Sequence, residues 1–295
     1  MSIRIGINPL TWSNDDLPSL GADIPLEACL REAAAAGYAG VELGHKFPRK
    51  AAELAPLLET HGLALVSGWY SLQLCKRDAE AEFAAMQPHF DLLQALDCRA
   101  MVCAEVTGCV HSEQSAPLSR RPTLAPAEFE RFTERLNSLA ELMRAQGMRL
   151  AYHHHMGTVI QTEQEIDALM ASSDAAVDLL LDTGHLVFAG GDPVAVASRH
   201  AARIAHVHCK DIRPRVLERC LNRDSSFLDA VLQGVFTVPG DGCVDYPSVF
   251  EPLRKAGYSG WLVVEAEQDP AVADPVTYAG MGFYYLEAQS RSWPA

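Results

Sequence analysis

Four apolar runs in the sequence end in clusters of acidic and histidine side chains. The runs with their clusters are Leu150–His155, Leu179–His185, Ile204–Asp211 and Trp261–Glu267. A buried carboxylate or imidazole costs free energy when it has no partner, and one divalent cation can stabilise several of them together. A lone histidine is more often a core or loop residue, but four such clusters that converge predict a metal site.

The twofold periodicity of a strand sorts the members of each cluster into two faces. Side chains two residues apart point the same way, so His154 points away from its neighbours and is expected to be structural, like His206. The pairs or triplets that share a face are His153 with His155, His206 with His208 and Lys210, and Glu265 with Glu267. Asp182 ends its run, and His185 can turn back over the site after Gly184.

Further polar and aromatic residues follow other expected strands and are candidates for contact with a substrate. These candidates are Asn8, Trp12, Asn14, Glu42, Trp69, Glu105 and Glu267. A tryptophan there is either a stacking wall for a ring-shaped substrate or core packing. Glu105 either contacts substrate hydroxyls or pairs with a neighbouring base. His111, in a long polar loop, is interpreted as a solvated loop histidine.

Strand-like and helix-like patterns alternate along the whole chain. The eight expected strands are Arg4–Asn8, Gly40–Leu43, Leu63–Gly68, Ala100–Ala104, Leu150–His153, Val177–Leu181, Ile204–His208 and Gly260–Glu265. Glycines such as Gly37 and Gly257 mark helix ends, where the left-handed conformation is needed. The alternation predicts a single (β/α)8 TIM barrel over residues 1–295, with an insertion at about 213–238 in the loop after strand seven, whose helix 226–232 could lie near the barrel mouth. A doubly wound sheet is the alternative, but no Gly-x-Gly-x-x-Gly follows the first strand.

The composition excludes several classes of protein. The net charge of −14 argues against a nucleic-acid partner, because phosphates would be repelled. No apolar run approaches the ~20 residues that span a bilayer, and the first residues do not resemble a secretion signal. None of the eight cysteines forms a Cys-x-x-Cys pair. We therefore expect a cytoplasmic protein with reduced thiols and no membrane partner; the sequence leaves a homo-oligomer open.

Three of the clusters resemble the signature of a known superfamily. The pattern Asp182-x-x-His185, the pattern His206-x-His208-x-Lys210-Asp211 and Glu265 are similar to motifs of the xylose-isomerase-like sugar isomerases and epimerases, which are divalent-metal TIM barrels. Three longer motifs resemble the inosose dehydratases of that superfamily: residues 12–16, 152–158 and 265–270. Those enzymes remove water from 2-keto-myo-inositol (scyllo-inosose) in myo-inositol catabolism.

The resemblance implies a set of metal ligands. The superfamily's metal positions fall on Asp182, His208 and Glu265, whereas the fourth, usually a glutamate, is occupied here by His153. Whether His153, His155 or water completes the shell is left open. A mixed set of His, Asp and Glu suits Mn²⁺, Co²⁺, Fe²⁺ or Zn²⁺ about equally. Mn²⁺ or Co²⁺ is the expected ion, with Fe²⁺ or Zn²⁺ as alternatives.

The resemblance also implies a reaction that begins with removal of a proton next to a ketone. His155 and His185 are the candidates for acid–base work, with Lys210 as a third participant unless it only pairs with Asp211. The expected substrate is a small neutral polyhydroxylated ring. The alternatives are a ketose isomerase or epimerase and a dehydroshikimate-type dehydratase. A metal-dependent DNA-repair endonuclease and a non-catalytic sugar sensor fit less well, since the chain lacks a basic groove and an accessory domain.

Overall fold

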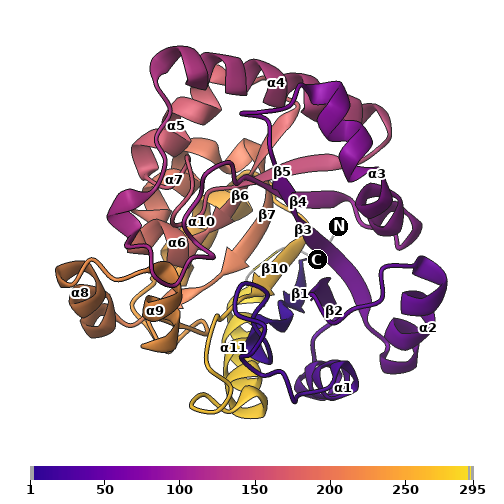
Figure 1. Cartoon of the computed structure of the whole chain (residues 1–295). Helices are drawn as coiled ribbons and strands as arrows, with labels where there is room; N and C mark the ends of the chain where they lie inside the picture. The colour runs from indigo at the N-terminus through magenta and orange to yellow at the C-terminus, as the bar shows by residue number, and fades with distance from the viewer. Residues whose placement is uncertain (1–2, 292, 294–295) are drawn as a thin grey trace.

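Eight parallel strands close into a barrel that is surrounded by helices (Figure 1). The computed structural model describes residues 3–291 and 293. The barrel strands, in chain order, are β1 (Arg4–Ile7), β2 (Gly40–Leu43), β3 (Ala64–Leu72), β4 (Ala100–Glu105), β5 (Arg149–His153), β6 (Val177–Asp182), β7 (Ile204–Cys209) and β10 (Trp261–Val264). Each strand pairs with its neighbours in the chain, and β10 closes the ring against β1. The prediction of a (β/α)8 barrel is confirmed.

Helices follow the barrel strands and cover the outside of the barrel (Figure 1). They are α1 (Leu26–Ala36), α2 (Ala51–His61), α3 (Ala79–Ala95), α4 (Pro126–Ala145), α5 (Glu163–Ser172), α6 (Thr183–Phe188), α7 (Pro193–His200), α10 (Tyr246–Lys255) and α11 (Pro275–Ser290). The sequence did not predict α6, α7 or α11, and it marked only the end of α10, at Gly257; α10 contains Pro252, and α11 contains Gly280 and Gly282, which obscure a helical pattern. Among residues 3–291 and 293, no helix has the length and apolar character that a membrane crossing requires.

The interior of the barrel is filled at its amino-terminal end by one large side chain. Trp261 packs there with Val66 and Val263, and the Arg4 guanidinium lies 3.9 Å from its ring centroid. A Cβ atom on Gly40 would lie 2.8 Å from both the Trp261 ring and the Ala64 carbonyl oxygen. Glycine at position 40 therefore makes room for Trp261.

We expect Gly40→Ala to lower the free energy of unfolding by about 1–3 kcal/mol, the usual cost of overpacking a core. The control is Gly280→Ala in α11, where the added Cβ would meet its nearest neighbour at an ordinary 3.9 Å and alanine favours the helix. Chemical denaturation of both variants measures the difference. Equal stability of the two proteins would contradict this view of the barrel interior.

The insertion after β7 forms a small unit with its own apolar cluster. It consists of β8 (Asp211–Ile212), α8 (Pro214–Asn222), α9 (Phe227–Leu232) and β9 (Phe236–Thr237), and β8 pairs antiparallel with β9. Its buried Phe227 reaches the histidine cluster, with ring centroids 5.0 Å from His155 and 5.6 Å from His185. The insertion therefore packs against the rings of His155 and His185, and α8 and α9 project from the barrel (Figure 1).

Candidate metal centre and active-site pocket

Four acidic and histidine side chains meet at the carboxyl ends of four strands. His153 and Asp182 end β5 and β6, His208 lies one residue before the end of β7, and Glu265 directly follows β10. The strand register places Asp182 beside His208. One ligand-type atom from each of the four side chains lies within 4.8 Å of the other three, and all four residues are buried. The structure thus brings together the residues that the sequence suggested as metal ligands.

The atoms that face the centre of this cluster lack hydrogen-bond partners. Among the described residues, this applies to Asp182 Oδ2, His208 Nδ1 and Glu265 Oε2, all of which are buried. Asp182 Oδ2 lies 3.5 Å from His153 Nε2 and 3.5 Å from His208 Nδ1, and His208 Nδ1 contacts Glu265 Oε2 closely. Buried polar atoms are normally paired. Carboxylate oxygens and imidazole nitrogens that converge without donors suit a cation, so this cluster can hold a metal.

The opposite side of each imidazole is fixed by a hydrogen bond. His153 Nδ1 donates to the next backbone carbonyl oxygen at 2.6 Å, so its Nε2 presents a lone pair to the cluster. His208 Nε2 donates to Glu42 at 3.2 Å, which leaves Nδ1 to face the cluster. Glu42 also accepts from Asn8 Nδ2 at 2.7 Å and from His206 Nε2 at 2.8 Å. Such outer contacts select the tautomer and orientation that a metal ligand needs.

The charges of the cluster match a divalent cation. Burial opposes ionisation of Glu42, but His208 and His206 hold the pKa of that carboxyl well below its ordinary value. Burial likewise opposes protonation of His208, yet Glu265 and Glu42 raise its pKa above the ordinary value. A proton and a metal therefore compete for His208. With both imidazoles neutral, the ligand carboxylates Asp182 and Glu265 carry two negative charges, which one divalent ion balances.

Lys210 lies beneath the cluster and is fully buried. Its Nζ donates to Glu267 Oε1 at 2.6 Å and lies 2.8 Å from Glu265 Oε1 and 3.0 Å from His185 Nε2. Burial alone would lower the pKa of Lys210, but the surrounding carboxylates raise it above its ordinary value. A Cβ on Gly184 would lie 2.5 Å from Lys210 Cγ, so glycine at that position leaves space for the lysine chain.

The expected alternative of a Lys210–Asp211 pair is wrong. Asp211 accepts hydrogen bonds from the backbone N–H groups of Ile212, Gly240 and Val244 at 2.8–3.0 Å. Asp211 thus holds the turn after β9 in place. The ammonium group of Lys210 pairs instead with Glu265 and Glu267.

A pocket of about 210 Å³ opens over the cluster. His153, His208 and Glu265 line it, with Asp182 buried behind them. Trp69 forms one wall, its ring edge-to-face with His153 at a centroid distance of 5.3 Å.

The two candidate acid–base histidines lie at different depths. His155 lines the pocket, whereas His185 lies behind it, with ring centroids 3.9 Å apart. Phe227 and Phe236 cover the other sides of His185. His185 is therefore within reach of His155 and Lys210 but is shielded from the pocket itself.

Four of the seven candidate substrate contacts line the pocket, namely Asn8, Glu42, Trp69 and Glu267. Trp69 lies within β3. That strand extends beyond its expected end at Gly68, because it pairs with β4 as far as Leu72, which lies opposite Glu105. Burial raises the pKa of Glu267 above its ordinary value, and Lys210 opposes this effect.

The prediction that Trp12, Asn14 and Glu105 contact a substrate is wrong. Their side chains do not line the pocket and bind other groups in the described structure. Trp12 Nε1 donates to Glu32 Oε2 at 2.7 Å, and its ring is core packing. Asn14 Oδ1 accepts the backbone N–H groups of Asp16 and Leu17 and so shapes the loop after β1. The Glu105 carboxylate accepts the N–H groups of Leu74 and Thr107 at 2.6 and 2.9 Å.

Asp15, a further candidate at the end of the first strand, also lines the pocket, whereas three of its polar lining residues were not predicted, namely Asp16, Ser71 and His111. His111 is not a solvated loop histidine but is buried, with its Nε2 atom 3.7 Å from Asp16 Oδ1. Asp15 and Asp16 directly follow Asn14 in a motif that the sequence did single out. That motif was the only signal for them, since twofold periodicity does not extend into loops.

The fold and this metal-type cluster define a family. The model of the xylose isomerase-like TIM barrel matches residues 30–286, and the chain belongs to that family.

Similar proteins include one from rhizopine metabolism and one dehydratase. The chain is 54% identical over 282 residues to the rhizopine catabolism protein MocC of Rhizobium meliloti, which covers 96% of this chain and 87% of that protein. It is 44% identical over 286 residues to the inosose dehydratase of Geobacillus thermodenitrificans, which covers 96% of both chains. A D-allulose 3-epimerase from Methylomonas sp., solved with D-allulose, has a TM-score of 0.67 at 17% identity and covers 98% of this chain and 97% of that one. At that identity, the epimerase shows likeness of fold alone.

Proposed function

We propose that this protein is an inosose dehydratase that removes water from scyllo-inosose in inositol catabolism. The observation that carries the proposal is the full-length similarity to inosose dehydratases in a chain whose pocket has a metal-type cluster at its floor. His153, Asp182, His208 and Glu265 would hold one divalent cation, for which Mn²⁺ or Co²⁺ is proposed; Fe²⁺ and Zn²⁺ also suit two nitrogen and two oxygen donors.

The bound cation would supply Lewis-acid stabilisation of the negative charge that develops when the proton next to the ketone is removed. His155 is the residue best placed to take that proton. Its Nδ1 donates to the Met156 carbonyl oxygen at 2.8 Å, so Nε2 carries the lone pair. Burial lowers the pKa of His155 well below its ordinary value, and His111 adds to the effect. The imidazole is therefore neutral near pH 7 and can accept a proton.

Glu267 and Lys210 are the residues that can deliver a proton to the leaving hydroxyl. Glu267 lines the pocket, and its contact with Lys210 at 2.6 Å gives the pair a proton to exchange. His185 contacts both Lys210 and the His155 ring. We assign His185 to positioning these groups, because it does not reach the pocket in the described structure.

The proposed substrate is neutral, and the proposed location is the cytoplasm. Nucleic acid is an unsuitable partner for a chain with a net charge of −14. The side chains around the pocket include Asp15, Asp16, Glu42, Glu265 and Glu267. So many carboxylates would repel a phosphorylated sugar.

The test is an assay of the purified, metal-reconstituted protein with scyllo-inosose, D-fructose and 3-dehydroshikimate. We expect the absorbance of the trihydroxycyclohexane dione product with scyllo-inosose only. Removal of the metal by a chelator should abolish this activity, and added Mn²⁺ or Co²⁺ should restore it. Turnover of fructose or dehydroshikimate in place of scyllo-inosose would contradict the proposal.

A further inference from the structure

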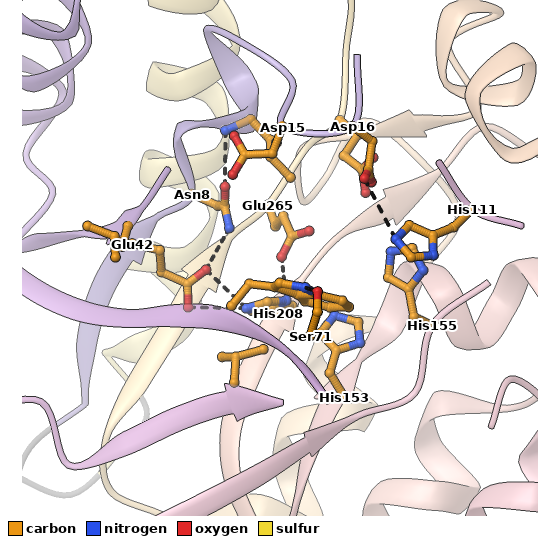
Figure 2. A pocket seen from close by; sticks show the side chains of 15 residues that line it. Asn8, Asp15, Asp16, Glu42, Ser71, His111, His153, His155, His208 and Glu265 are labelled. Atoms are coloured by element: carbon orange, nitrogen blue, oxygen red, sulfur yellow. Dashed lines mark hydrogen bonds and ion pairs between the residues drawn. The ribbon is translucent and has the colours of Figure 1, made fainter. Parts of the chain in front are cut away.

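Two side chains from different loops face each other beside the pocket. Asp16 follows β1 and His111 follows β4, and Asp16 Oδ1 lies 3.7 Å from His111 Nε2 (Figure 2). This distance is too long for a hydrogen bond, but a hydroxyl group between the two atoms can contact both. His111 Nδ1 also has no hydrogen-bond partner among the described residues. The pair therefore keeps unused hydrogen-bonding capacity next to the pocket.

The position of His111 is fixed by its surroundings. The N–H of Val110 donates to the Gly157 carbonyl oxygen at 3.0 Å. Gly157 has a φ of +79°, and a Cβ there would lie 2.9 Å from the backbone nitrogen of His111. Only glycine therefore allows the two loops to approach so closely. The His111 ring packs edge-to-face against His155 and Trp69 with centroid distances of 5.0 and 6.2 Å. His111 is thus held in place before any ligand arrives.

Asp16 is held by a turn of its own loop. Asn14 Oδ1 accepts the N–H groups of Asp16 and Leu17 at 2.9 and 2.7 Å, which is the geometry of an Asx turn. The neighbouring Asp15 is already engaged, because its Oδ1 atom lies 2.7 Å from His45 Nδ1. Of the two adjacent carboxylates, Asp16 is therefore the one that can accept a hydrogen bond from a ligand.

We infer that Asp16 and His111 bind the hydroxyl groups on the edge of the substrate ring that is turned away from the metal-type cluster, and so determine which polyol ring the site accepts. This inference rests on the proposed function. A carboxylate can only accept from a hydroxyl, whereas an imidazole nitrogen can donate or accept. A hydroxyl between them satisfies both groups. A ring that lacks this hydroxyl leaves them unpaired in a partly buried site, which costs binding free energy.

The inference is tested with the variants Asp16→Asn and His111→Gln. The matched control is Glu113→Gln, because Glu113 lies on the same loop as His111 but is exposed. Each protein is assayed with scyllo-inosose and with its analogue deoxygenated at the carbon opposite the ketone. The natural protein should lose about 10- to 100-fold in kcat/KM on the analogue, the worth of a hydrogen bond to a charged group. Both variants should lose a similar factor on scyllo-inosose, mainly through KM, and should no longer discriminate between the two compounds. Bound metal should remain at one per chain, and Glu113→Gln should behave as the natural protein does.

Binding of scyllo-inositol, which has no ketone and cannot react, gives a second measurement by calorimetry on the metal-loaded proteins. We expect a Kd about 10- to 100-fold higher in the two pocket variants and unchanged in Glu113→Gln. If the natural protein binds scyllo-inositol but does not turn over scyllo-inosose, the proposed function fails while the weakened binding in the variants still supports the pair. Unchanged binding and discrimination in both variants would overturn the inference, as would loss of bound metal from either variant.

Discussion

Glu265→Gln is expected to lose most of its bound metal and to lower turnover of scyllo-inosose by at least about 10³-fold, the scale of Lewis-acid stabilisation in a metal enzyme. Glu265 supplies one of the two carboxylates in the cluster, and its Oε2 atom faces the cluster without a hydrogen-bond donor. The amide of glutamine is neutral and a poorer ligand, and the cluster would keep only one negative charge. Elemental analysis after dialysis, beside steady-state rates, measures both effects.

The control for this variant is Glu251→Gln on α10, where the glutamate is exposed and paired with Lys255. It should retain about one metal per chain and normal turnover, because exposed ion pairs contribute little. Excess Mn²⁺ or Co²⁺ should restore part of the activity of Glu265→Gln, since the defect is affinity. Full metal retention with lost activity would instead assign Glu265 to proton transfer.

The sequence predicted the metal-type cluster because strand geometry is regular. Residues at the carboxyl ends of parallel barrel strands meet at one face, and twofold periodicity separates inward from outward side chains. His153 and His155 accordingly line the pocket, whereas His154 Nε2 lies 3.2 Å from the backbone nitrogen of Asp182, outside the pocket lining. Predicting the residues of the cluster required only the residue at which each strand ends, and the expected strand ends lie close to those in the structure.

The loops could not be predicted in the same way. Trp12, Asn14 and Asp16 stand within five residues of one another, yet only Asp16 lines the pocket, because Trp12 packs in the core and the Asn14 side chain closes an Asx turn. Glu105 ends a strand like the true cluster members, but free backbone N–H groups in the adjacent loops occupy its carboxylate. His111 is brought to the pocket by close approach to Gly157, a contact between distant parts of the chain. Such contacts leave no periodic signal in the sequence.

Lys210→Met is expected to damage both stability and catalysis. The Lys210 ammonium group lies 2.8 Å from Glu265 Oε1, 2.6 Å from Glu267 Oε1 and 3.8 Å from Asp182 Oδ2. Removing one partner from a buried ion pair costs about 3–5 kcal/mol, because the other charge is left uncompensated. Turnover should fall by about 10²–10⁴-fold, the usual contribution of a proton-transfer group. Denaturant unfolding of the metal-free and metal-loaded proteins gives the first effect, and steady-state rates give the second.

The double variant Lys210→Met/Glu267→Gln separates the two effects. Glu267 lies 2.6 Å from Lys210 Nζ, so replacing both partners removes the uncompensated charge together with the ion pair. Most of the lost stability should return, because a neutral replacement for a buried pair is often close to neutral in free energy. Activity should not return, since neither residue can then exchange a proton. Metal binding should stabilise the single variant more than it stabilises the natural protein, because the cation then replaces the positive charge of Lys210 beside Asp182 and Glu265. If the double variant recovered turnover as well as stability, Lys210 would serve only to balance charge, and the proton for the leaving hydroxyl would have to come from His155 or another pocket residue.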